Sequence, residues 1–406
     1  MTSPRRPWLT RNLKIVSGVS LLQDAASELL YPLLPILLTS VLGAPAAVVG
    51  IVEGVAEGVA AVTKIVAGRL ADRFPKVPIV ASGYGLAAVG KVLVAAAGIW
   101  PVVLVGRCVD RLGKGIRGAP RDALLVDGIP VDARGRAFGF HRAADTAGAV
   151  IGPLIALGSY ELLHHHLRPL LWVAVVPAVC SVLLVFLLHE PSRPAAPRPT
   201  APRIDVKQAE RLPAPYWRVV VVIALFGLVN FPDALVLLRL HEIGFSVVGV
   251  ILAYVLYNVV YSALSYPAGV VADRLSPQTV VGVGLVVFAV VYAGLGASRN
   301  HLAAWLLLAG YGAYTGLTDG AGKAWVSSLL PRHAQGTGQG LFQGISGAAV
   351  LVAGVWAGLA WGADGRIPLL VSGCIAAVVA VALLALPRRL FSVPAVDAAA
   401  VPAAGS

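Results

Sequence analysis

Charged residues are scarce in this chain. Asp, Glu, Lys and Arg make up only 13% of its 406 residues, whereas soluble domains carry about a quarter. Apolar residues account for 58% of the chain, and the mean hydropathy is +0.81. This composition is typical of a protein that lies within a lipid bilayer.

Cysteine is nearly absent as well. The three cysteines, Cys108, Cys180 and Cys374, each lie in an apolar run, and they form neither a C-x-x-C pair nor an even disulfide set. We expect them to be inert packing residues.

The signatures of common enzymes and pumps are also missing. The chain contains no H-E-x-x-H, no G-x-S-x-G and no P-loop with its terminal Lys-Ser/Thr. His164, His165 and His166 are adjacent, so they cannot all converge on one ion from a helix, and we expect a solvated loop there. The sequence therefore predicts no enzyme, no ATP-driven pump, no cofactor and no metal site.

Long apolar runs are what the chain does contain. A bilayer core about 30 Å thick needs roughly 20 mainly apolar residues per helix. Twelve such stretches occur, near residues 15–40, 46–67, 79–98, 101–125, 136–160, 169–189, 217–238, 246–268, 279–297, 302–329, 338–361 and 367–387. The first contains Asp24 and Glu28 and lacks a small-residue cleavage site, so we expect it to remain as a span.

The basic residues are distributed unevenly between the loops. Twelve spans place both termini on one side, and most loop Lys and Arg lie on that terminal side. The loops of the other side carry only Arg168, Arg239, Arg299 and Arg366. The net charge of +12 therefore follows the positive-inside rule and does not indicate a nucleic-acid partner. We expect a multi-pass protein of the cell inner or plasma membrane with both termini cytoplasmic.

The chain divides near its middle. Residues 190–216 are rich in Pro and charge, as expected of a cytoplasmic linker between an N-terminal bundle (1–189) and a C-terminal bundle (217–390), with a disordered cytoplasmic tail at 391–406. The two halves also resemble each other, because Gly68 to Arg73 (GRLADR) recurs 201 residues later as Gly269 to Arg274 (GVVADR). We expect an all-α membrane protein with two pseudo-symmetric six-helix bundles and a solute site between them.

Residues 68–76 read GRLADRFPK, between the second and third spans. This loop resembles the G-x-L-a-D-R-x-G-R-[KR] signature of the major facilitator superfamily, although Phe74-Pro75-Lys76 replaces the usual Gly-Arg-Lys run. The resemblance covers almost the whole chain. It implies the two-bundle fold, transport by alternating access and a monomeric carrier.

The same resemblance suggests a gate on the cytoplasmic side. In the superfamily pattern the loop Asp approaches the N-terminal end of span 11, where the helix dipole favours an anion, and the basic residues pair with an acidic end of span 4. The residues that this pattern assigns to the gate are Gly68, Asp72, Arg73, Lys76, Asp122, Asp127, Asp273 and Arg274.

Two further elements are similar to those of proton-coupled drug antiporters. Span 5 contains Gly148-x3-Gly152-Pro153, similar to their G-x3-G-P element. Span 4 reads Arg111-Leu-Gly-Lys114-Gly115, similar to their R-x-x-Q-G pattern, which implies a coupling role for Arg111. The chain also resembles a branch of prokaryotic permeases whose substrates are mostly unassigned.

Span 4 carries a basic stripe. At 100° per residue, Arg107, Arg111, Lys114 and Arg121 fall within about 40° of one line. The overlapping G-x-G-x-x-G match at 113–118 is accidental, because a dinucleotide turn needs a strand before it. Two interpretations stay open: Arg107 and Lys114 attract anionic groups in a cavity, or the cations only neutralise nearby carboxylates.

Paired carboxylates supply the opposite charge. Asp24 and Glu28 share one face of span 1 with Tyr31, and Glu53 and Glu57 lie one turn apart on span 2. Neighbouring carboxylates repel each other when ionised, so one of each pair is expected to take up a proton. We regard Asp24, Glu28, Glu53 and Glu57 as proton-coupling candidates; the alternative is permanent ion pairing with span 4.

Other polar residues remain to form the solute site. On span 5, Arg142 and Asp145 are expected to form an internal ion pair. At the repeat offset, Tyr254 replaces Glu53 and Asn258 replaces Glu57, so neutral groups line the second half. The substrate-cavity candidates are Tyr31, Arg107, Lys114, Asn230, Asp233, Tyr254, Tyr257, Asn258, Asp319 and Lys323.

The sequence favours a secondary active transporter, a proton-coupled exporter of a small organic solute or drug. Its partners would be that solute, protons and membrane lipid. An importer or uniporter of an anionic metabolite is the first alternative, because span 4 carries excess cations. A lipid flippase on the same fold is a further alternative.

Overall fold

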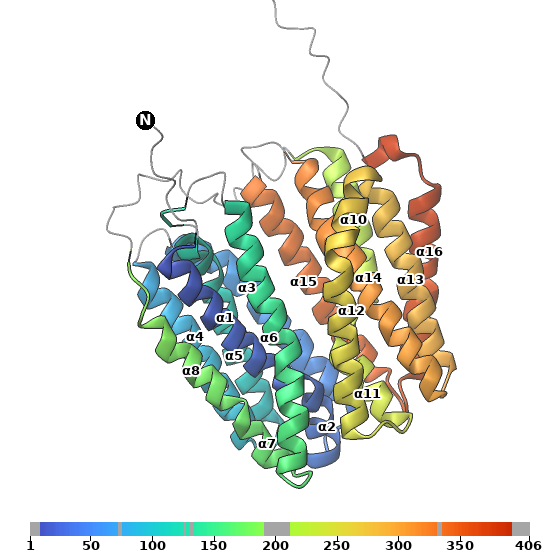
Figure 1. Ribbon diagram of the computed structural model, residues 1–406. Coiled ribbons are helices and arrows are strands. Elements are labelled where there is room, and N and C mark those ends of the chain that lie inside the picture. Colours follow the sequence, from blue (N-terminus) through green and yellow to red (C-terminus); the bar gives the residue numbers. More distant parts are fainter. Residues whose placement is uncertain are drawn as a thin grey trace, which may run out of the picture.

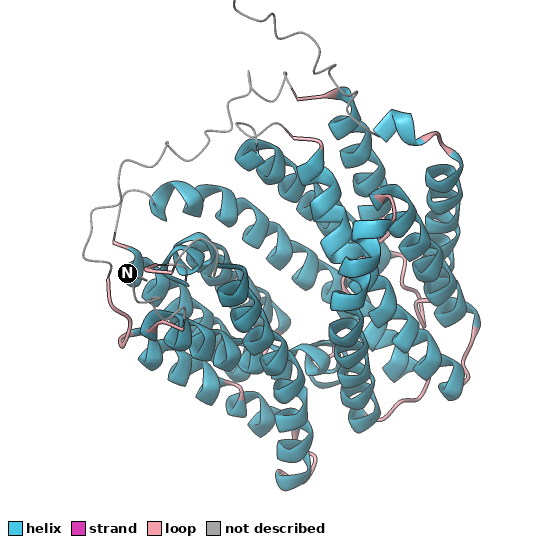
Figure 2. Cartoon of the chain, turned by 45° about the horizontal axis from the view of Figure 1, so that its top comes forward, coloured by secondary structure: helices cyan, strands magenta, loops and turns pink. Residues whose placement is uncertain are grey.

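The computed structural model describes residues 9–71, 75–125, 127–129, 134–190, 212–330 and 335–391. Within these ranges, the side chains of residues 65–71, 134–136, 266, 268–274 and 335–337 are not described. The described residues form helices joined by loops and contain no strand (Figure 2). The all-α expectation is confirmed.

The N-terminal half forms one bundle (Figure 1). Its first span comprises α1 (Arg11–Leu30), η1 (Tyr31–Leu33), α2 (Leu34–Ile36) and η2 (Leu37–Val41). The other spans are α3 (Ala46–Ala71), α4 (Lys76–Ala96), α5 (Trp100–Leu125), α6 (Arg134–Leu162), and the pair α7 (Leu167–Val173) and α8 (Val175–Val185).

The C-terminal half repeats this arrangement. Its first span is the pair α10 (Ala214–Gly227) and α11 (Asp233–Glu242). The remaining elements are α12 (Val247–Arg274), α13 (Pro277–Ala297), α14 (His301–Ser328), α15 (Gln335–Leu359), α16 (Arg366–Ala385) and η5 (Arg388–Phe391). Every predicted span thus coincides with one helix or with consecutive helices.

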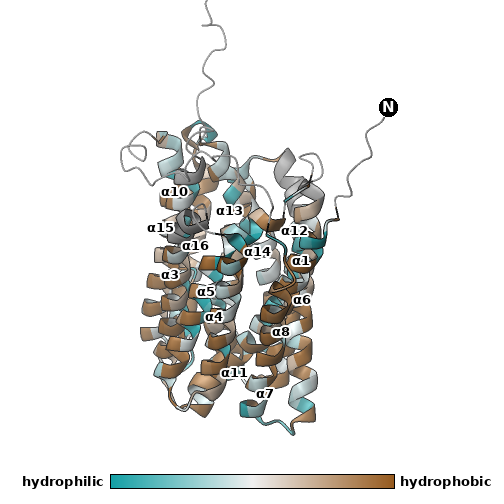
Figure 3. Cartoon of the chain, turned by 90° about the vertical axis from the view of Figure 1, so that its left-hand side faces the viewer, coloured by the Kyte–Doolittle hydropathy of each residue, from teal (hydrophilic) through white to brown (hydrophobic). Residues whose placement is uncertain are grey.

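The helix surfaces suit a bilayer. Eight described helical segments are long and apolar enough to cross a membrane. Apolar residues dominate the middle of the helices in Figure 3. α5 is not among the eight segments, because it carries the basic stripe.

Local sequence explains where several helices begin and break. Asn300 caps α14, since its Oδ1 accepts a hydrogen bond from the Ala303 backbone N–H at 3.1 Å. The first span of each half is interrupted at the same repeat position, at Tyr31-Pro32 and 201 residues later at Pro232-Asp233. Proline lacks the N–H that a continuous helix needs, so the repeat includes its helix breaks.

Glycines let the helices of the N-terminal bundle approach closely. A Cβ on Gly113 of α5 would collide with the carbonyl oxygen of Gly83 of α4. Gly115 likewise faces Thr63 of α3, whereas Gly118 has no atom within 4 Å. The G-x-G-x-x-G match is therefore part of a helix contact, as the sequence indicates.

The two halves touch mainly through α3 and α15. A Cβ on Gly50 of α3 would collide with the backbone of Gly354 of α15, and a Cβ on Gly347 would lie 2.7 Å from Ala61. Ser40 Oγ and His241 Nε2 are 3.4 Å apart, and these residues are separated by the repeat offset of 201. The contact between Ser40 and His241 lies at the end of the molecule opposite the start of α1 and opposite η5. We call this end the loop face and the other end the terminal face (Figure 1).

Two expectations from the sequence are wrong. Arg239 is not a loop cation: it is 1% exposed, and its guanidinium binds the carbonyl oxygens of Leu295 at 3.1 Å and of Asp364 at 2.8 Å. Cys180 and Cys374 are exposed on helix surfaces and do not pack inside the protein. An apolar run says little about which side of a helix faces inward.

Candidate functional site

The basic stripe of α5 is largely neutralised by carboxylates. Arg107 donates two hydrogen bonds to Glu53, from Nε to Oε1 and from Nη2 to Oε2, each 2.7 Å. Arg111 Nε lies 3.0 Å from Glu57 Oε1. Both carboxylates come from α3, so the arginines and the α3 glutamates form two parallel pairs. For these four residues the structure matches the ion-pairing alternative.

A buried lysine extends this network. Lys91 of α4 donates to Asp110 Oδ1 at 2.8 Å, and the other Asp110 oxygen lies 3.8 Å from Arg107 Nη1. Both members of the Lys91–Asp110 pair are nearly fully buried. Lys91 is not among the site residues predicted from the sequence, although a lone lysine within an apolar run indicates a buried partner.

The remaining cations of α5 differ from one another. The guanidinium of Arg117 lies 4.3 Å from the ring centre of Tyr84, a cation–π contact. Arg121 pairs with its neighbour Asp122 at 3.0 Å. Lys114 has an exposed side chain and no carboxylate oxygen within 4.0 Å among the described residues.

The carboxylates of α1 lie at the seam between the halves. Tyr254 of α12 donates its hydroxyl to Glu28 Oε2, and the Tyr254 ring lies 5.5 Å from that of Tyr31. The guanidinium of Arg107 sits 5.8 Å from the Tyr31 ring centre. Among the described residues, no Lys or Arg nitrogen lies within 4.0 Å of Asp24 or Glu28. These two carboxylates are therefore not held in ion pairs.

The antiporter-like glycines lie beside Asp24. A Cβ on Gly148 of α6 would collide with α1 at the carbonyl oxygen of Leu21 and the Cβ of Asp24. Gly152 is pressed against Ala25 in the same way. These glycines thus bring α6 against the carboxylate face of α1, and Pro153 follows Gly152 within α6.

The expected ion pair on α6 is wrong. Arg142 donates to the hydroxyl of Tyr261 of α12 at 2.9 Å, and Asp145 lies near His141, 3.7 Å from its Nε2. Tyr261 in turn donates to Asp319 Oδ2 at 3.3 Å. Helical spacing on α6 could not reveal this contact, because the partner of Arg142 belongs to the other half.

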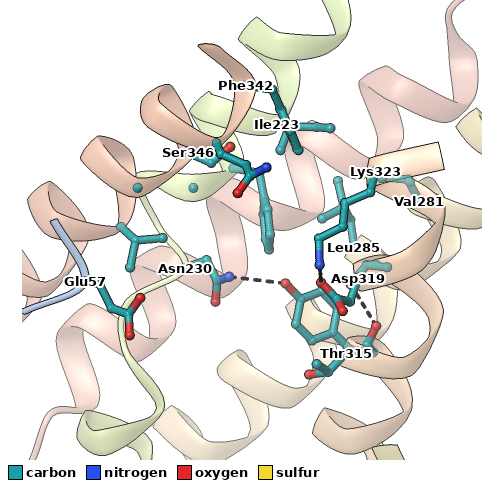
Figure 4. Close-up of a pocket in the computed structure, with 18 of the residues that line it drawn as sticks. Glu57, Ile223, Asn230, Val281, Leu285, Thr315, Asp319, Lys323, Phe342 and Ser346 are labelled. Atoms are coloured by element: carbon teal, nitrogen blue, oxygen red, sulfur yellow. Dashed lines mark hydrogen bonds and ion pairs between the residues drawn. The ribbon is translucent and has the colours of Figure 1, made fainter. Parts of the chain in front are cut away.

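A cavity of about 500 Å³ lies between the halves, on the terminal side of the contact between Gly50 and Gly354. Its walls come from α3, α10 to α15 and the break between α10 and α11. In Figure 4, Glu57 and Asn230 lie across the cavity from Asp319 and Lys323. Lys323 is 60% exposed and Lys64 is also exposed, so the cavity is open toward the terminal face.

Tyrosines form the deep end of this cavity. Tyr311 donates to Asp233 Oδ1 at 2.6 Å, and Asn230 Nδ2 donates to the Tyr314 hydroxyl at 3.3 Å. The ring of Tyr311 stacks on those of Tyr257 and Tyr314, with centroids 5.2 and 5.7 Å apart. Tyr311 and Tyr314 are not among the cavity residues predicted from the sequence, although their i, i+3 spacing in GYGAYTG indicates one helix face.

The predicted cavity residues divide into two groups. Those that line the cavity, together with the coupling candidate Glu57, are Asn230, Asp233, Tyr257, Asp319 and Lys323. Those that do not are Tyr31, Arg107, Lys114, Tyr254 and Asn258. Asn258 is buried and donates to the carbonyl oxygen of Tyr254 within its own helix at 3.1 Å, and Tyr254 borders a small gap beside Asp233.

Among the described residues, no group of three or more His, Cys, Asp or Glu is placed to hold a metal ion. His165 pairs with Glu161 at 3.0 Å, and both side chains are more than half exposed. His164 and His165 adopt positive φ angles in a turn.

Comparison with known proteins assigns the family. The model of the Major Facilitator Superfamily matches residues 16–238 and 234–401. The chain belongs to the major facilitator superfamily. It is 29% identical over 360 residues to an uncharacterized MFS-type transporter of Methanocaldococcus jannaschii, covering 87% of this chain and 89% of the relative. It is 32% identical over 159 residues to the multidrug resistance protein MdtH of Salmonella arizonae, covering 39% of each.

Solved structures of the superfamily share the fold. A mutant of the nucleoside transporter NupG superimposes with a TM-score of 0.80 at 14% identity, over 94% of this chain and all of that one. An inward-facing bacterial homolog of the lysosomal transporter Spinster gives 0.77 at 15% identity, over 97% of this chain and all of that one. The fold is that of secondary transporters which work by alternating access.

The superfamily loop falls mostly outside the described residues. Asp72 and Arg73 lie outside them, and the side chains of Gly68, Asp273 and Arg274 belong to the part that is not described. Of the acidic partners expected on span 4, Asp122 pairs with Arg121 and Asp127 is exposed.

Lys76 is engaged through its backbone. Its N–H and that of Val77 donate to the two carboxylate oxygens of Glu190, each at 2.8 Å. Glu190 therefore caps the N-terminus of α4, where the helix dipole favours an anion. Glu190 is the first residue of the predicted linker, so this end of the linker is attached to the N-terminal bundle.

Proposed function

We propose that this superfamily member is a proton-coupled exporter of a small organic solute, with Glu28 and Asp24 as its proton-binding groups. The observation that carries the proposal is the bond from Tyr254 to Glu28. It joins a carboxylate of the N-terminal half to a hydroxyl of the C-terminal half, and no cation neutralises that carboxylate among the described residues.

Protonation of Glu28 would change how the halves hold together. An ionised carboxylate accepts a charge-assisted hydrogen bond, which is about twice as strong as a neutral one. An unpaired charge in a membrane protein costs a few kcal/mol or more, so the neutral form gains wherever water is excluded. Proton binding at Glu28 therefore weakens its contact with Tyr254 and favours separation of α1 from α12. This links the proton to the movement of one half against the other.

The other coupling candidates have different surroundings. Glu53 is fixed by Arg107 and is almost fully buried, so we assign it a structural role. Glu57 pairs with Arg111, but its side chain is 39% exposed and it lines the cavity. The pair from Glu57 to Arg111 is thus the point where a solute can reach the α5 network, which suits the coupling role suggested for Arg111.

Export rather than import is supported by three features. Relatives over two-fifths of the chain are named multidrug resistance proteins. The motive for an anion importer is weaker than the sequence suggests, because Glu53, Glu57 and Asp110 offset the cations of α5. If the termini are cytoplasmic, the cavity opens toward the cytoplasm, which is the side from which an exporter binds its solute.

The terminal face also carries the proposed gate. When the halves close there, the loop with Asp72 and Arg73 would meet the start of α15, as the superfamily pattern implies. The linker at 190–216 and the tail at 391–406 would lie on this face as well. Both bundles belong to one chain, and we propose that it works as a monomer.

The test is transport by the purified carrier in liposomes. A thermal-shift screen against antibiotics and metabolites first identifies a solute that binds. Its flux is then measured with an imposed pH gradient in either orientation and after the gradient is dissipated. Proton-coupled export predicts flux that follows the gradient and stops when it collapses. Flux that ignores the gradient in both orientations contradicts the coupling.

A further inference from the structure

We infer that the deep end of the cavity binds an organic cation with an aromatic group, through the carboxylate of Asp233 and the tyrosine rings around it. The inference rests on the proposed function, because it names the class of solute. It is carried by the charges and rings that face the cavity.

Asp233 is the cavity carboxylate that lacks a cation. Among the described residues that line the cavity, Glu57 pairs with Arg111 and Asp319 pairs with Lys323 at 2.6 Å. The partners of Asp233 are neutral hydroxyls: Tyr311 donates to Oδ1 at 2.6 Å, and Tyr257 also forms a hydrogen bond with the carboxylate. Asp233 is half-buried and lines the cavity, so a solute in the cavity can reach its carboxylate.

The backbone holds this carboxylate in place. Asp233 is the first residue of α11, directly after the break at Pro232. The N-terminal end of a helix favours an anion there. The helix end therefore attracts the carboxylate without supplying a cation to pair with it, so its charge is available to a cationic solute.

Aromatic rings form the walls of the cavity beside Asp233. Tyr257, Tyr311 and Tyr314 line the cavity, and the ring of Tyr311 stacks on the other two. Phe226 lies edge-on to Tyr314, with centroids 5.9 Å apart. Ring faces attract cations within about 6 Å of their centroids and stack on flat solutes. A carboxylate among ring faces suits a positive aromatic solute and disfavours a negative one.

The lysines of the cavity do not reverse this preference. Lys323 is 12 residues beyond Tyr311 on α14, which places it about 18 Å nearer the terminal face at 1.5 Å per residue. It is neutralised by Asp319. Lys64 is also exposed at the open end. A volume of about 500 Å³ lies within the usual range for drug-sized ligands.

The experiment is a binding assay on the purified full-length carrier by isothermal titration calorimetry. Tetraphenylphosphonium is the aromatic cation, tetraphenylborate is the anion of the same shape, and tetrabutylammonium is the aliphatic cation. The wild type should bind the phosphonium more tightly than either of the others. Equal or tighter specific binding of the borate overturns the inference.

Two matched variants locate the site. Asp233→Asn should weaken phosphonium binding about tenfold, equivalent to about 1.4 kcal/mol. The double variant Asp319→Asn with Lys323→Gln removes both members of the ion pair in the same cavity. It should weaken binding no more than about twofold, because no charge is left unpaired. Equal losses in the two variants, or no loss in Asp233→Asn, overturn the assignment.

Two variants of Tyr311 distinguish the role of its ring from that of its hydroxyl. Tyr311→Phe keeps the ring and removes its hydroxyl, so phosphonium affinity should stay within about twofold, while Tyr311→Leu should lower it several-fold. If the carrier binds the cation through Asp233 but a pH gradient drives no flux, the proposed function is contradicted and this inference is supported. If a pH gradient drives flux of a solute whose binding does not depend on Asp233, this inference is contradicted and the proposed function is supported.

Discussion

Arg107 and Glu53 meet in a two-bonded pair, with both nitrogen–oxygen distances at 2.7 Å and both side chains almost fully buried. The pair ties α5 to α3 inside the N-terminal bundle. Such a pair gains little net stability over apolar packing, but losing one partner leaves an isolated buried charge.

The first prediction follows from that asymmetry. Glu53→Gln and Arg107→Met should each destabilise the carrier by about 3–5 kcal/mol. The double variant should recover most of that loss, because no charge remains unpaired. Thermal unfolding in detergent measures all three proteins. Additive losses in the double variant contradict the account.

The second prediction concerns the contact between the halves. Gly50→Ala places a Cβ against the backbone of Gly354, so α3 and α15 must move apart at this point to make room for it. The variant should favour a state in which α3 and α15 separate at the loop face. The cavity would then close toward the terminal face, where Lys64 lies. Thiol labelling of a Lys64→Cys variant that lacks Cys108, Cys180 and Cys374 should therefore become slower.

A matched control distinguishes this from a general effect of alanine. Gly85 is also a helical glycine, on α4, but a Cβ there meets no atom within 4 Å. Gly85→Ala should leave the labelling rate unchanged. Equal rates for Gly50→Ala and the parent protein would show that the α3–α15 contact does not govern access to the cavity.

The third prediction concerns the loop face. Asp364 accepts hydrogen bonds from Arg299 at 2.7 Å and lies 3.1 Å from Arg239. Hydrogen bonding by Arg299 lowers the pKa of Asp364 below its ordinary value of 3.8. A lowered pKa means that the loop is stabilised while Asp364 is ionised and loses that contribution as the pH falls through the folded-state pKa.

Hydrogen exchange of residues 360–366 provides the measurement. Once corrected for intrinsic exchange rates, protection should be constant from about pH 8 to pH 5 and decline below about pH 4. Asp364→Asn should have lower protection throughout and no acid step. A step near pH 6 in the parent protein would instead require a histidine and would contradict this assignment.

The architecture was predictable because each element depends on local sequence. Twelve apolar runs and a motif repeated after 201 residues sufficed for the two-bundle fold, and the same offset separates Ser40 from His241 where the halves meet. The pairing of Glu53 and Glu57 with the arginines was anticipated as one of two alternatives. Helical spacing showed that the two glutamates share one helix face and the two arginines another, but it did not show which residues would pair.

Some contacts could not be predicted from helical spacing in the sequence, because they depend on how the helices pack together. Arg142 is three residues from Asp145, yet it reaches Tyr261 of the other half. Arg239 follows an apolar run near a predicted loop, yet it turns inward to bind carbonyl groups. Neither partner is near in sequence, so only the tertiary arrangement places them.

The most direct test of the central claim is solute transport by Glu28→Gln in liposomes, with and without a pH gradient. A glutamine keeps the shape of the side chain and its acceptor for Tyr254 but cannot release a proton. Glu161→Gln, an exposed change at the loop face, is the control. The account predicts that Glu28→Gln loses gradient-driven flux while it still exchanges labelled for unlabelled solute, and that Glu161→Gln retains both. Gradient-driven flux at the wild-type rate in Glu28→Gln would contradict it.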